Sequence, residues 1–590
     1  MIFEIANTVI SVMVISALIS LSFLLPEKEG FFTGEANKTK KFLALTSLIW
    51  IVTSAGNFLG TLARIFESSL VDVLKVNVIR SFGTQVTLGK LLAFQILSAL
   101  FICLFAPRVK KNGGAIWLLL LAVAGVVAPV FQSHSSSLGS HGLAIGSLVI
   151  HVIALSFWIG GVISLLLMTE KTRALAFSRV SAISLWASSF VFVSGLLNAW
   201  TRLRLSDAWM TSYGALIGLK VVLTLVVLII ASRLRKEISV NRLLPLEVFT
   251  LILIMSIGAV LNRFTPVEDA PESFDKVREL VGISMPLEPN VSRVFFEYEA
   301  NGLILGILIL ATALYIRGVV ALSRRGIKWP VGRTISFAIG ISLLDYATSG
   351  GLGLYAHFSF QYHMIAHMTL SMIAPIAIIL SAPITLALRT LPIGRDKEER
   401  GIRGLLIALL HSKPTAVWTH PLVALVIFDG SLFALYFTPL FGNLMSSHFG
   451  HMIMDLHFIA AGLLFFHVIV GIDPNPRRVH HLVRVVLLLG AMSIHAFFSV
   501  ALMSANELID GGYYMLLDRP WATDLLSDQK VGAAIGWAMG EIPIVIALIA
   551  TFIQWMRSDA REASRADKRS AVDLAEYNEY LQKLSLREDK

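Results

Sequence analysis

The sequence has a single cysteine and few charged residues, and each of these two features excludes certain classes of protein. Cys103 is the only cysteine among 590 residues, which excludes a disulfide framework and any CxxC-type thiol metal carrier. Charged residues make up 15% of the chain, whereas apolar residues make up 56% and the mean hydropathy is +0.74. A chain of this composition is too apolar for a water-soluble protein.

Signals for nucleotide binding and for export are also missing. The chain has no GxxxxGK[ST] loop, so nothing indicates a nucleotide site, and we expect no enzymatic turnover. Residues 1–25 lack both a basic n-region and a small-residue cleavage site, so we expect a retained helix rather than a signal peptide. The net charge of +10 then indicates basic loops on the inner side of a membrane rather than nucleic-acid binding.

Apolar runs of the length that crosses a bilayer, roughly 18–25 residues, recur along almost the whole chain. They predict an all-α, polytopic integral membrane protein with about fifteen transmembrane helices. The predicted spans are residues 5–25, 42–62, 88–106, 115–131, 145–168, 178–199, 213–232, 246–263, 300–317, 334–355, 364–388, 418–438, 450–471, 483–503 and 531–555.

Basic loops follow the odd-numbered spans, and this pattern predicts the orientation and the domains. Under the positive-inside rule the N-terminus lies outside and the C-terminus lies in the cytoplasm. The polar, proline-containing stretch 264–299 is then extracytoplasmic. We expect an eight-helix membrane domain over 1–263, a linker over 264–299, a seven-helix membrane domain over 300–558 and a charged cytoplasmic tail over 559–590.

The stretch from His363 to Met372 carries the clearest chemical signal. On a helix His363 and His367 share one face because they are four residues apart. Met364, Met368 and Met372 repeat the same spacing one position along. Imidazole beside thioether suits copper, and Cu(I) in particular. Membrane helices are also rich in Met, and two His can simply lie at the membrane interface, so the spacing alone leaves both interpretations open.

Further polar residues fall in the same outer half of the second predicted domain. His451 and Asp455 are four residues apart, so the carboxylate can orient the imidazole or offset the charge of a cation. Asp345, Asp429 and Glu541 also lie inside predicted spans, where an acid costs roughly 2.5–3.5 kcal/mol and usually faces a partner or a cavity. The other candidate metal ligands are His457, His495 and Glu541 in the second domain, and His151, His134 and His141 in the first.

Five stretches of the second domain are similar, in residues and in order, to those of a known family. They are Phe358–Met368, Ser381–Arg389, His451–Gly462, Gly471–Pro476 and Asp528–Pro543. On these stretches residues 291–558 resemble the cytochrome c oxidase assembly factor CtaG family. The resemblance implies a seven-helix membrane protein that delivers copper for oxidase assembly, with an oxidase subunit as the copper acceptor.

Three stretches of the first domain are similar to another family: His151–Gly161, Tyr213–Lys220 and Leu246–Glu247. Residues 145–265 thereby resemble the copper resistance protein D (CopD) family, whereas the first four spans match it in topology only. The resemblance implies copper uptake by the first half, supplied by an extracytoplasmic copper carrier, in a multi-pass protein of the bacterial plasma membrane. The fusion of the two families resembles an actinobacterial arrangement.

Two other function classes stay open. A b-type cytochrome would ligate haem with His pairs that face each other across helices, but His363 and His367 on one helix cannot supply opposite axial ligands. Such a protein would show a Soret band. A proton- or cation-coupled transporter would use the buried acids for another substrate, and it would retain no copper.

Overall fold

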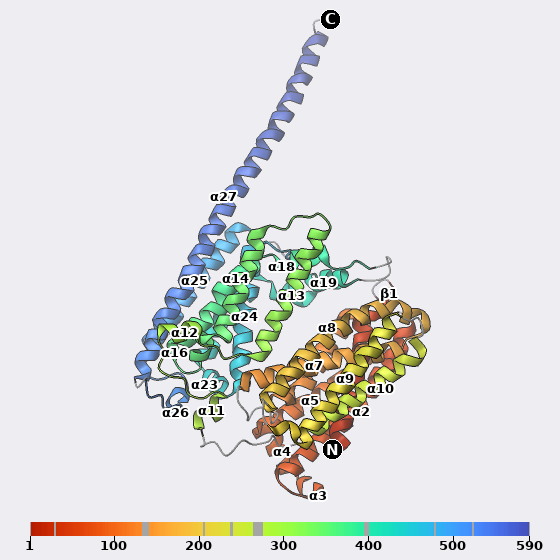
Figure 1. The fold of residues 1–590 in the computed structure, drawn as a ribbon. Helices are drawn as coiled ribbons and strands as arrows, with labels where there is room; N and C mark the ends of the chain where they lie inside the picture. The colour runs from red at the N-terminus through yellow and green to blue at the C-terminus, as the bar shows by residue number, and fades with distance from the viewer. Residues whose placement is uncertain are drawn as a thin grey trace.

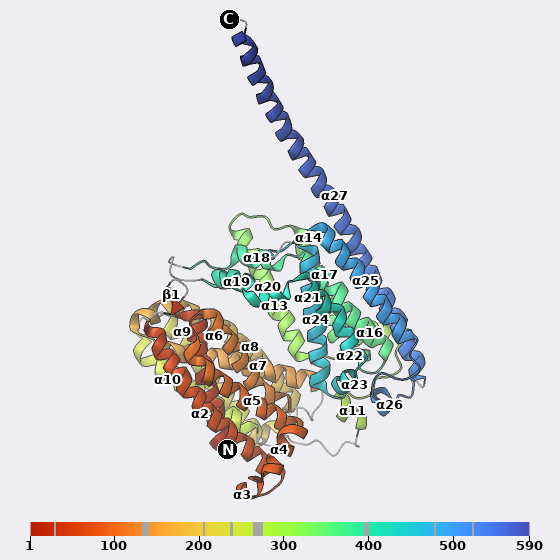
Figure 2. The same ribbon diagram turned by 180° about the vertical axis from the view of Figure 1, so that it is seen from behind.

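The protein is almost entirely helical in the computed structural model, and its helices form two bundles (Figure 1). The bundles lie side by side, with the N-terminal one in red to yellow and the C-terminal one in green to blue (Figure 2). Among the described residues the only strands are β1 (Glu27–Lys28) and β2 (Phe31–Phe32), which pair antiparallel. The all-α prediction is confirmed. The structure describes residues 2–28, 31–32, 34–132, 141–203, 207–236, 240–262, 275–394, 401–476, 479–521 and 524–588.

The N-terminal bundle is built from long helices joined by short turns, and two short helices follow it. Their bounds are α1 (Ile2–Ile19), η1 (Ser20–Leu24), α2 (Gly34–Ile65), α3 (Leu70–Val73), α4 (Val76–Gln85), α5 (Thr87–Phe105), η2 (Ala106–Arg108), α6 (Asn112–Val127), η3 (Ala128–Gln132), α7 (His141–Leu166), α8 (Glu170–Leu203), η5 (Asp207–Met210), α9 (Ser212–Lys236), α10 (Val240–Leu261), α11 (Lys276–Val281) and α12 (Val291–Phe296).

The C-terminal bundle contains more interrupted helices, and its last helix extends far beyond it (Figure 1). Residues 559–588 of the predicted tail continue that helix away from the bundle. The bounds are α13 (Gly302–Arg324), α14 (Val331–Thr348), α15 (Gly351–Ala356), α16 (Phe360–Met368), η6 (Thr369–Ile373), α17 (Ala374–Leu380), α18 (Pro383–Thr390), α19 (Ile402–Leu410), α20 (Lys413–Trp418), α21 (Pro421–Leu425), η7 (Val426–Gly430), α22 (Ser431–Tyr436), α23 (Leu440–Met445), α24 (His448–Val470), α25 (His481–Met503), α26 (Tyr513–Leu516) and α27 (Leu525–Glu588).

Thirteen helices of the described chain are long and apolar enough to cross a membrane, and each coincides with a predicted span. The two other predicted spans differ. The stretch 334–355 is divided between α14 and α15, because Gly350 adopts an extended conformation between them. The stretch 418–438 is a short apolar helix, Pro421–Tyr436, that contains the π-helical turn η7. The prediction of a polytopic membrane protein is therefore confirmed. Of the roughly fifteen predicted spans, thirteen meet the criteria of length and apolar composition among the described residues.

Each bundle has its own hydrophobic core, and the two bundles meet where α7 crosses α13. The crossing depends on glycine: a methyl group on Gly302 would lie 2.8 Å from the carbonyl oxygen of Leu143, and one on Gly146 would collide with the backbone of Leu303. Small residues allow helix backbones to approach this closely in membranes. Phe131 and Phe449 add a ring contact between the bundles, with centroids 4.4 Å apart.

Asp528 fixes the start of α16. Its carboxylate accepts hydrogen bonds from Ser359 Oγ at 2.8 Å and from the backbone N–H groups of Phe360 at 3.0 Å and Gln361 at 3.2 Å. The buried Arg519 pairs with the same carboxylate at 3.2 Å. A carboxylate at this position satisfies N–H groups that the first helical turn leaves without partners. Residues from two family-like stretches far apart in sequence thus set the position of α16.

Asp473 plays the same part for α18. Its carboxylate accepts from the N–H groups of Ile384 at 3.1 Å and Thr385 at 2.7 Å, and from Thr385 Oγ1 at 2.6 Å. The chain reaches this position through Gly471, whose φ of +61° favours glycine and ends α24. Two more family-like stretches therefore meet in space as a helix and its cap.

The orientation in the membrane stays a prediction, and two cysteine variants test it. Leu287, 67% exposed in the linker, is predicted outside, and Ile393, 72% exposed after α18, is predicted inside. In a chain that carries Cys103→Ala, Leu287→Cys should react with a membrane-impermeant thiol reagent in wall-less intact cells. Ile393→Cys should react only after lysis. The opposite labelling pattern would reverse the orientation.

Candidate metal site

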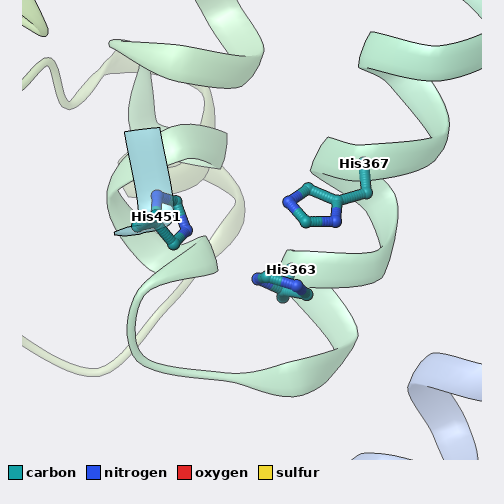
Figure 3. Close-up of side chains that lie close together, drawn as sticks. All are labelled: His363, His367 and His451. Carbon is teal, nitrogen blue, oxygen red and sulfur yellow. The ribbon is translucent and has the colours of Figure 1, made fainter. Parts of the chain in front are cut away.

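Three buried histidines from two helices converge in the C-terminal bundle. His363 and His367 project from successive turns of α16 toward His451 on α24 (Figure 3). One ligand nitrogen from each residue lies within 4.8 Å of the other two, and the side chains are 0%, 1% and 6% exposed. The four-residue spacing of His363 and His367 predicts their shared face. Their proximity to His451 is a result of the fold.

The hydroxyl of Tyr436 holds the two imidazoles of α16. Its oxygen lies 3.0 Å from His363 Nε2 and 3.0 Å from His367 Nδ1. A hydroxyl has one hydrogen, so it donates to one imidazole and accepts an N–H from the other. The opposite ring nitrogens, His363 Nδ1 and His367 Nε2, have no hydrogen-bond partner within the described part of the chain. In this arrangement only the imidazole that donates its N–H to Tyr436 has a lone pair on the opposite nitrogen, whereas both imidazoles have one when the hydroxyl oxygen accepts from both.

Asp455 brings a carboxyl group to this cluster. Its Oδ1 lies 3.6 Å from His367 Nε2, and its Oδ2 lies 3.6 Å from His451 Nδ1. Both distances exceed those of direct hydrogen bonds. The carboxylate therefore sits between two imidazoles without being tightly bound to either, where it can offset the charge of a cation.

A fourth histidine, His357, supports His451 from the side. The two rings stack with centroids 3.9 Å apart, and His357 Nδ1 lies 2.9 Å from the carbonyl oxygen of Gly353. Tyr513 donates its hydroxyl proton to the His357 carbonyl oxygen at 3.1 Å. Burial raises the pKa of Tyr513, which keeps this phenol protonated as a donor.

The sequence did not single out Tyr436 or His357 as part of the site. His357 comes directly before the family-like stretch that begins at Phe358, and this position was the one available signal. Tyr436 carried no signal, because its partners lie about seventy positions away and no spacing rule connects them.

The predicted thioether ligands lie in the core. Met364 and Met368 are fully buried members of the C-terminal hydrophobic core. Met364 faces α27, because a methyl group on Gly536 would lie 2.7 Å from its Cε. The neighbouring helix turn is unusual: η6, which follows directly after Met368, is π-helical. Such turns are frequent at functional sites.

The other candidates of the C-terminal bundle are spread over three places. His457 lies on the exposed face of α24, since it is six positions beyond His451 on a helix of 3.6 residues per turn. His495 lies on α25 with its Nδ1 4.0 Å from Asp429 Oδ1. Glu541 is half-buried on α27, accepts from Trp537 Nε1 at 3.3 Å and lines an open hollow of about 500 Å³. Within the described residues the group of converging ligand nitrogens is therefore His363, His367 and His451, without these three.

In the N-terminal bundle His151 has polar partners on both ring nitrogens. Its Nδ1 lies 3.0 Å from Ser194 Oγ, and its Nε2 lies 3.5 Å from Lys220 Nζ. This pairing joins two of the family-like stretches, and an adjacent ammonium group opposes binding of a metal cation at the same nitrogen. His134 lies outside the described residues, and so does the side chain of His141, the first residue of α7.

Comparison with protein families identifies both halves of the chain. The model of the cytochrome c oxidase caa3 assembly factor (Caa3_CtaG) matches residues 313–558. The model of copper resistance protein D matches residues 174–261, and that of the copper resistance protein D-like N-terminal domain matches residues 8–143. The last match covers the four spans for which the sequence indicated topology alone. The chain thus carries regions that match both families, in a multi-pass bacterial membrane protein, as the sequence stretches predicted.

Several curated proteins are similar to parts of the chain. Uncharacterized proteins of Mycobacterium bovis and Mycobacterium tuberculosis are each 38% identical over 310 residues, 52% of this chain and 47% of the relative. The copper transport protein CutJ of Bacillus subtilis is 27% identical over 222 residues, 33% of this chain and 41% of CutJ. The chain thus spans about half the length of the curated relatives it matches. No solved structure matches it.

The shared hydroxyl of Tyr436 makes a testable contribution to stability. Tyr436→Phe leaves two buried imidazole nitrogens without their partner, which should lower the free energy of unfolding by about 1–3 kcal/mol. Tyr514→Phe is the matched control, because the buried Tyr514 hydroxyl has no hydrogen-bond partner among the residues described. Thermal unfolding of the detergent-purified protein should show a lower Tm for Tyr436→Phe alone. Equal stability of the two variants would contradict the shared bond.

Proposed function

We propose that the chain is a copper-handling membrane protein whose C-terminal bundle holds copper for cytochrome c oxidase assembly. The observation that carries this proposal is the group of His363, His367 and His451, with a ligand nitrogen of each within 4.8 Å of the others. The matched families supply the metal, since imidazole alone suits copper, zinc, iron and nickel alike. We take residues 300–558 as the delivery domain and residues 1–263 as the uptake domain, joined by 264–299.

The charge of the site favours the cuprous ion as cargo. The three imidazoles bind a metal as neutral ligands, and among the described residues Asp455 is the acid paired with them, which supplies one negative charge when it is ionised. A charge buried this deeply is tolerated when it is compensated. One carboxylate compensates one positive charge, which matches Cu(I) rather than Cu(II).

The residues around the site prepare the histidines for exchange of a metal ion. Tyr436 fixes two imidazoles on successive turns, so little side-chain entropy is lost when the ion binds. Neutral imidazoles grip Cu(I) less strongly than thiolates do, which favours release. In the predicted orientation the site lies in the outer half of the bilayer. An ion held there can pass sideways to histidines of a membrane subunit by ligand exchange, without crossing lipid as a bare cation.

We assign copper uptake to the N-terminal bundle on the likeness to copper resistance protein D and to CutJ. The pairing of His151 with Lys220 argues that an ion on this route does not bind at His151 in the present conformation. The donor is then an extracytoplasmic copper carrier, and the acceptor is an oxidase subunit.

The packing of the site argues against haem. The rings of His363 and His367 lie 3.9 Å apart between centroids, and so do those of His357 and His451. Tyr436 bonds directly to both imidazoles of α16. These contacts leave no slot for a planar macrocycle between the histidines. A transporter for another substrate differs from the copper proposal in one measurable respect, since it retains no copper.

Copper content tests the site. The purified full chain, loaded with Cu(I) without oxygen, should lose the ion held by this cluster when His363, His367 and His451 are replaced by Ala. His457→Ala should keep wild-type copper content, because His457 lies on the exposed face of α24. Circular dichroism and elution volume establish that both variants are folded. Wild-type copper content in the triple variant would make the cluster structural.

Oxidase assembly tests the role. Cells whose full-length chain carries the triple substitution should make oxidase polypeptide but little active, copper-loaded enzyme. Added copper should rescue them only in part, because delivery rather than uptake is missing. Cells with His457→Ala should assemble oxidase normally. Normal oxidase activity and copper content in the triple variant would refute delivery and leave uptake or resistance as the function.

A further inference from the structure

A second pair of buried polar side chains lies away from the three histidines, on η7 and α25. Asp429 and His495 are both 0% exposed. Neither carboxylate oxygen of Asp429 has a hydrogen-bond partner among the described residues. An ionised carboxylate without hydrogen bonds or a counter-charge is one of the costliest groups to bury, so Asp429 requires either a proton or a positive partner.

The protonation of His495 follows from its other contact. His495 Nε2 lies 3.2 Å from the carbonyl oxygen of Gly536. A carbonyl oxygen only accepts, so Nε2 carries the proton of the neutral imidazole and Nδ1 carries the lone pair. This lone pair faces Asp429 Oδ1 at 4.0 Å, and Nδ1 has no hydrogen-bond partner in the described structure. When Asp429 is ionised, two acceptors therefore face each other, and 4.0 Å is also too long for a protonated carboxyl group to donate to Nδ1.

The gap between the two acceptors has the size of a bridged metal ion. Metal–nitrogen bonds to His and metal–oxygen bonds to carboxylate are each about 2.0–2.2 Å long. Their sum corresponds to the 4.0 Å that separates Nδ1 and Oδ1. A direct hydrogen bond would need an approach of about 3 Å. Ser499 lies one helical turn beyond His495 on the same face, and its buried hydroxyl also has no hydrogen-bond partner among the described residues.

The surroundings hold the pair open in this geometry. Asp429 lies on the π-helical turn η7, which inserts an extra residue into its helix. His495 packs against Gly540 of α27 so closely that a methyl group at that position would collide with the imidazole. The Gly536 carbonyl that orients His495 belongs to the same residue against which Met364 packs. The pair is thereby connected through α27 to the helix that bears His363 and His367.

We propose that Asp429 and His495 form a second binding site for a monovalent transition-metal cation, Cu(I), in the same bundle. Within the pair itself, one carboxylate and one neutral imidazole balance an ion that carries a single positive charge. The imidazole nitrogen selects a transition metal over an alkali cation. The inference rests on the proposed function for the identity of the cation alone. The bundle then binds two ions. An ion can move from one site to the other, so the bundle transfers copper rather than only storing it.

Counting bound ions tests the second site. The full chain, purified in detergent without oxygen, is titrated with Cu(I) against a chromophoric Cu(I) chelator. We expect two ions per wild-type chain and one ion in each of Asp429→Asn and His495→Gln. Asp345→Asn is the matched control, because it neutralises another acid of the bundle whose carboxylate accepts from Tyr298 at 3.0 Å. It should still bind two ions.

The same titration separates the two proposals. The triple variant of His363, His367 and His451 should keep one ion, and its combination with Asp429→Asn should keep none. If the triple variant loses an ion while Asp429→Asn and His495→Gln keep two, the second site is refuted and the first stands. If Asp429→Asn and His495→Gln lose an ion while the triple variant keeps two, the first site is refuted and the second stands. One ion in the wild type that survives both single substitutions also refutes the second site. Two variants are used so that misfolding of either one, detected by its Tm, leaves a test.

Discussion

The contact between α27 and α16 determines where the C-terminal bundle places its polar side chains. Gly532, Gly536 and Gly540 recur every four residues on α27, and added methyl groups there would meet Phe360, Met364 and His495. This smooth stripe lets the helix backbones approach closely. At one end of the contact Asp528 caps α16. If the contact loosened, the histidines of α16 and the imidazole of His495 would lose the packing surface of α27 that fixes their positions.

The membrane explains why these polar groups are so closely matched to one another. Water does not compete for hydrogen bonds inside the bundle. Each polar atom therefore either pairs with another protein group or remains able to bind a ligand. Tyr436 satisfies one nitrogen of His363 and one of His367, which leaves the opposite nitrogens. Asp429 has no such partner. Buried nitrogen and oxygen atoms without hydrogen-bond partners are therefore concentrated at a few positions. A ligand that binds at these positions forms the most favourable new interactions.

Sequence reasoning succeeded where the relevant order is local. Apolar runs located the spans, and the four-residue spacing predicted that His363 and His367 share a face and that His451 and Asp455 do so as well. It failed where the order is set by packing. His457 was grouped with His451, although helix geometry turns it to the exposed face. Tyr436 and the pairing of His495 with Asp429 depend on how separate helices meet, and no spacing within the chain encodes that.

The π-helical turns η6 and η7 make both polar sites depend on local helix geometry and not on residue type alone. Each turn holds one residue more than an α-helix would. If such a turn relaxed to regular α-helix with the same residues, everything beyond it would rotate by about 100°. Beyond η7 lies Tyr436, which would then turn away from α16 although every side chain of the site was still encoded. A change that straightened this turn would thus keep the composition of the site and lose its geometry.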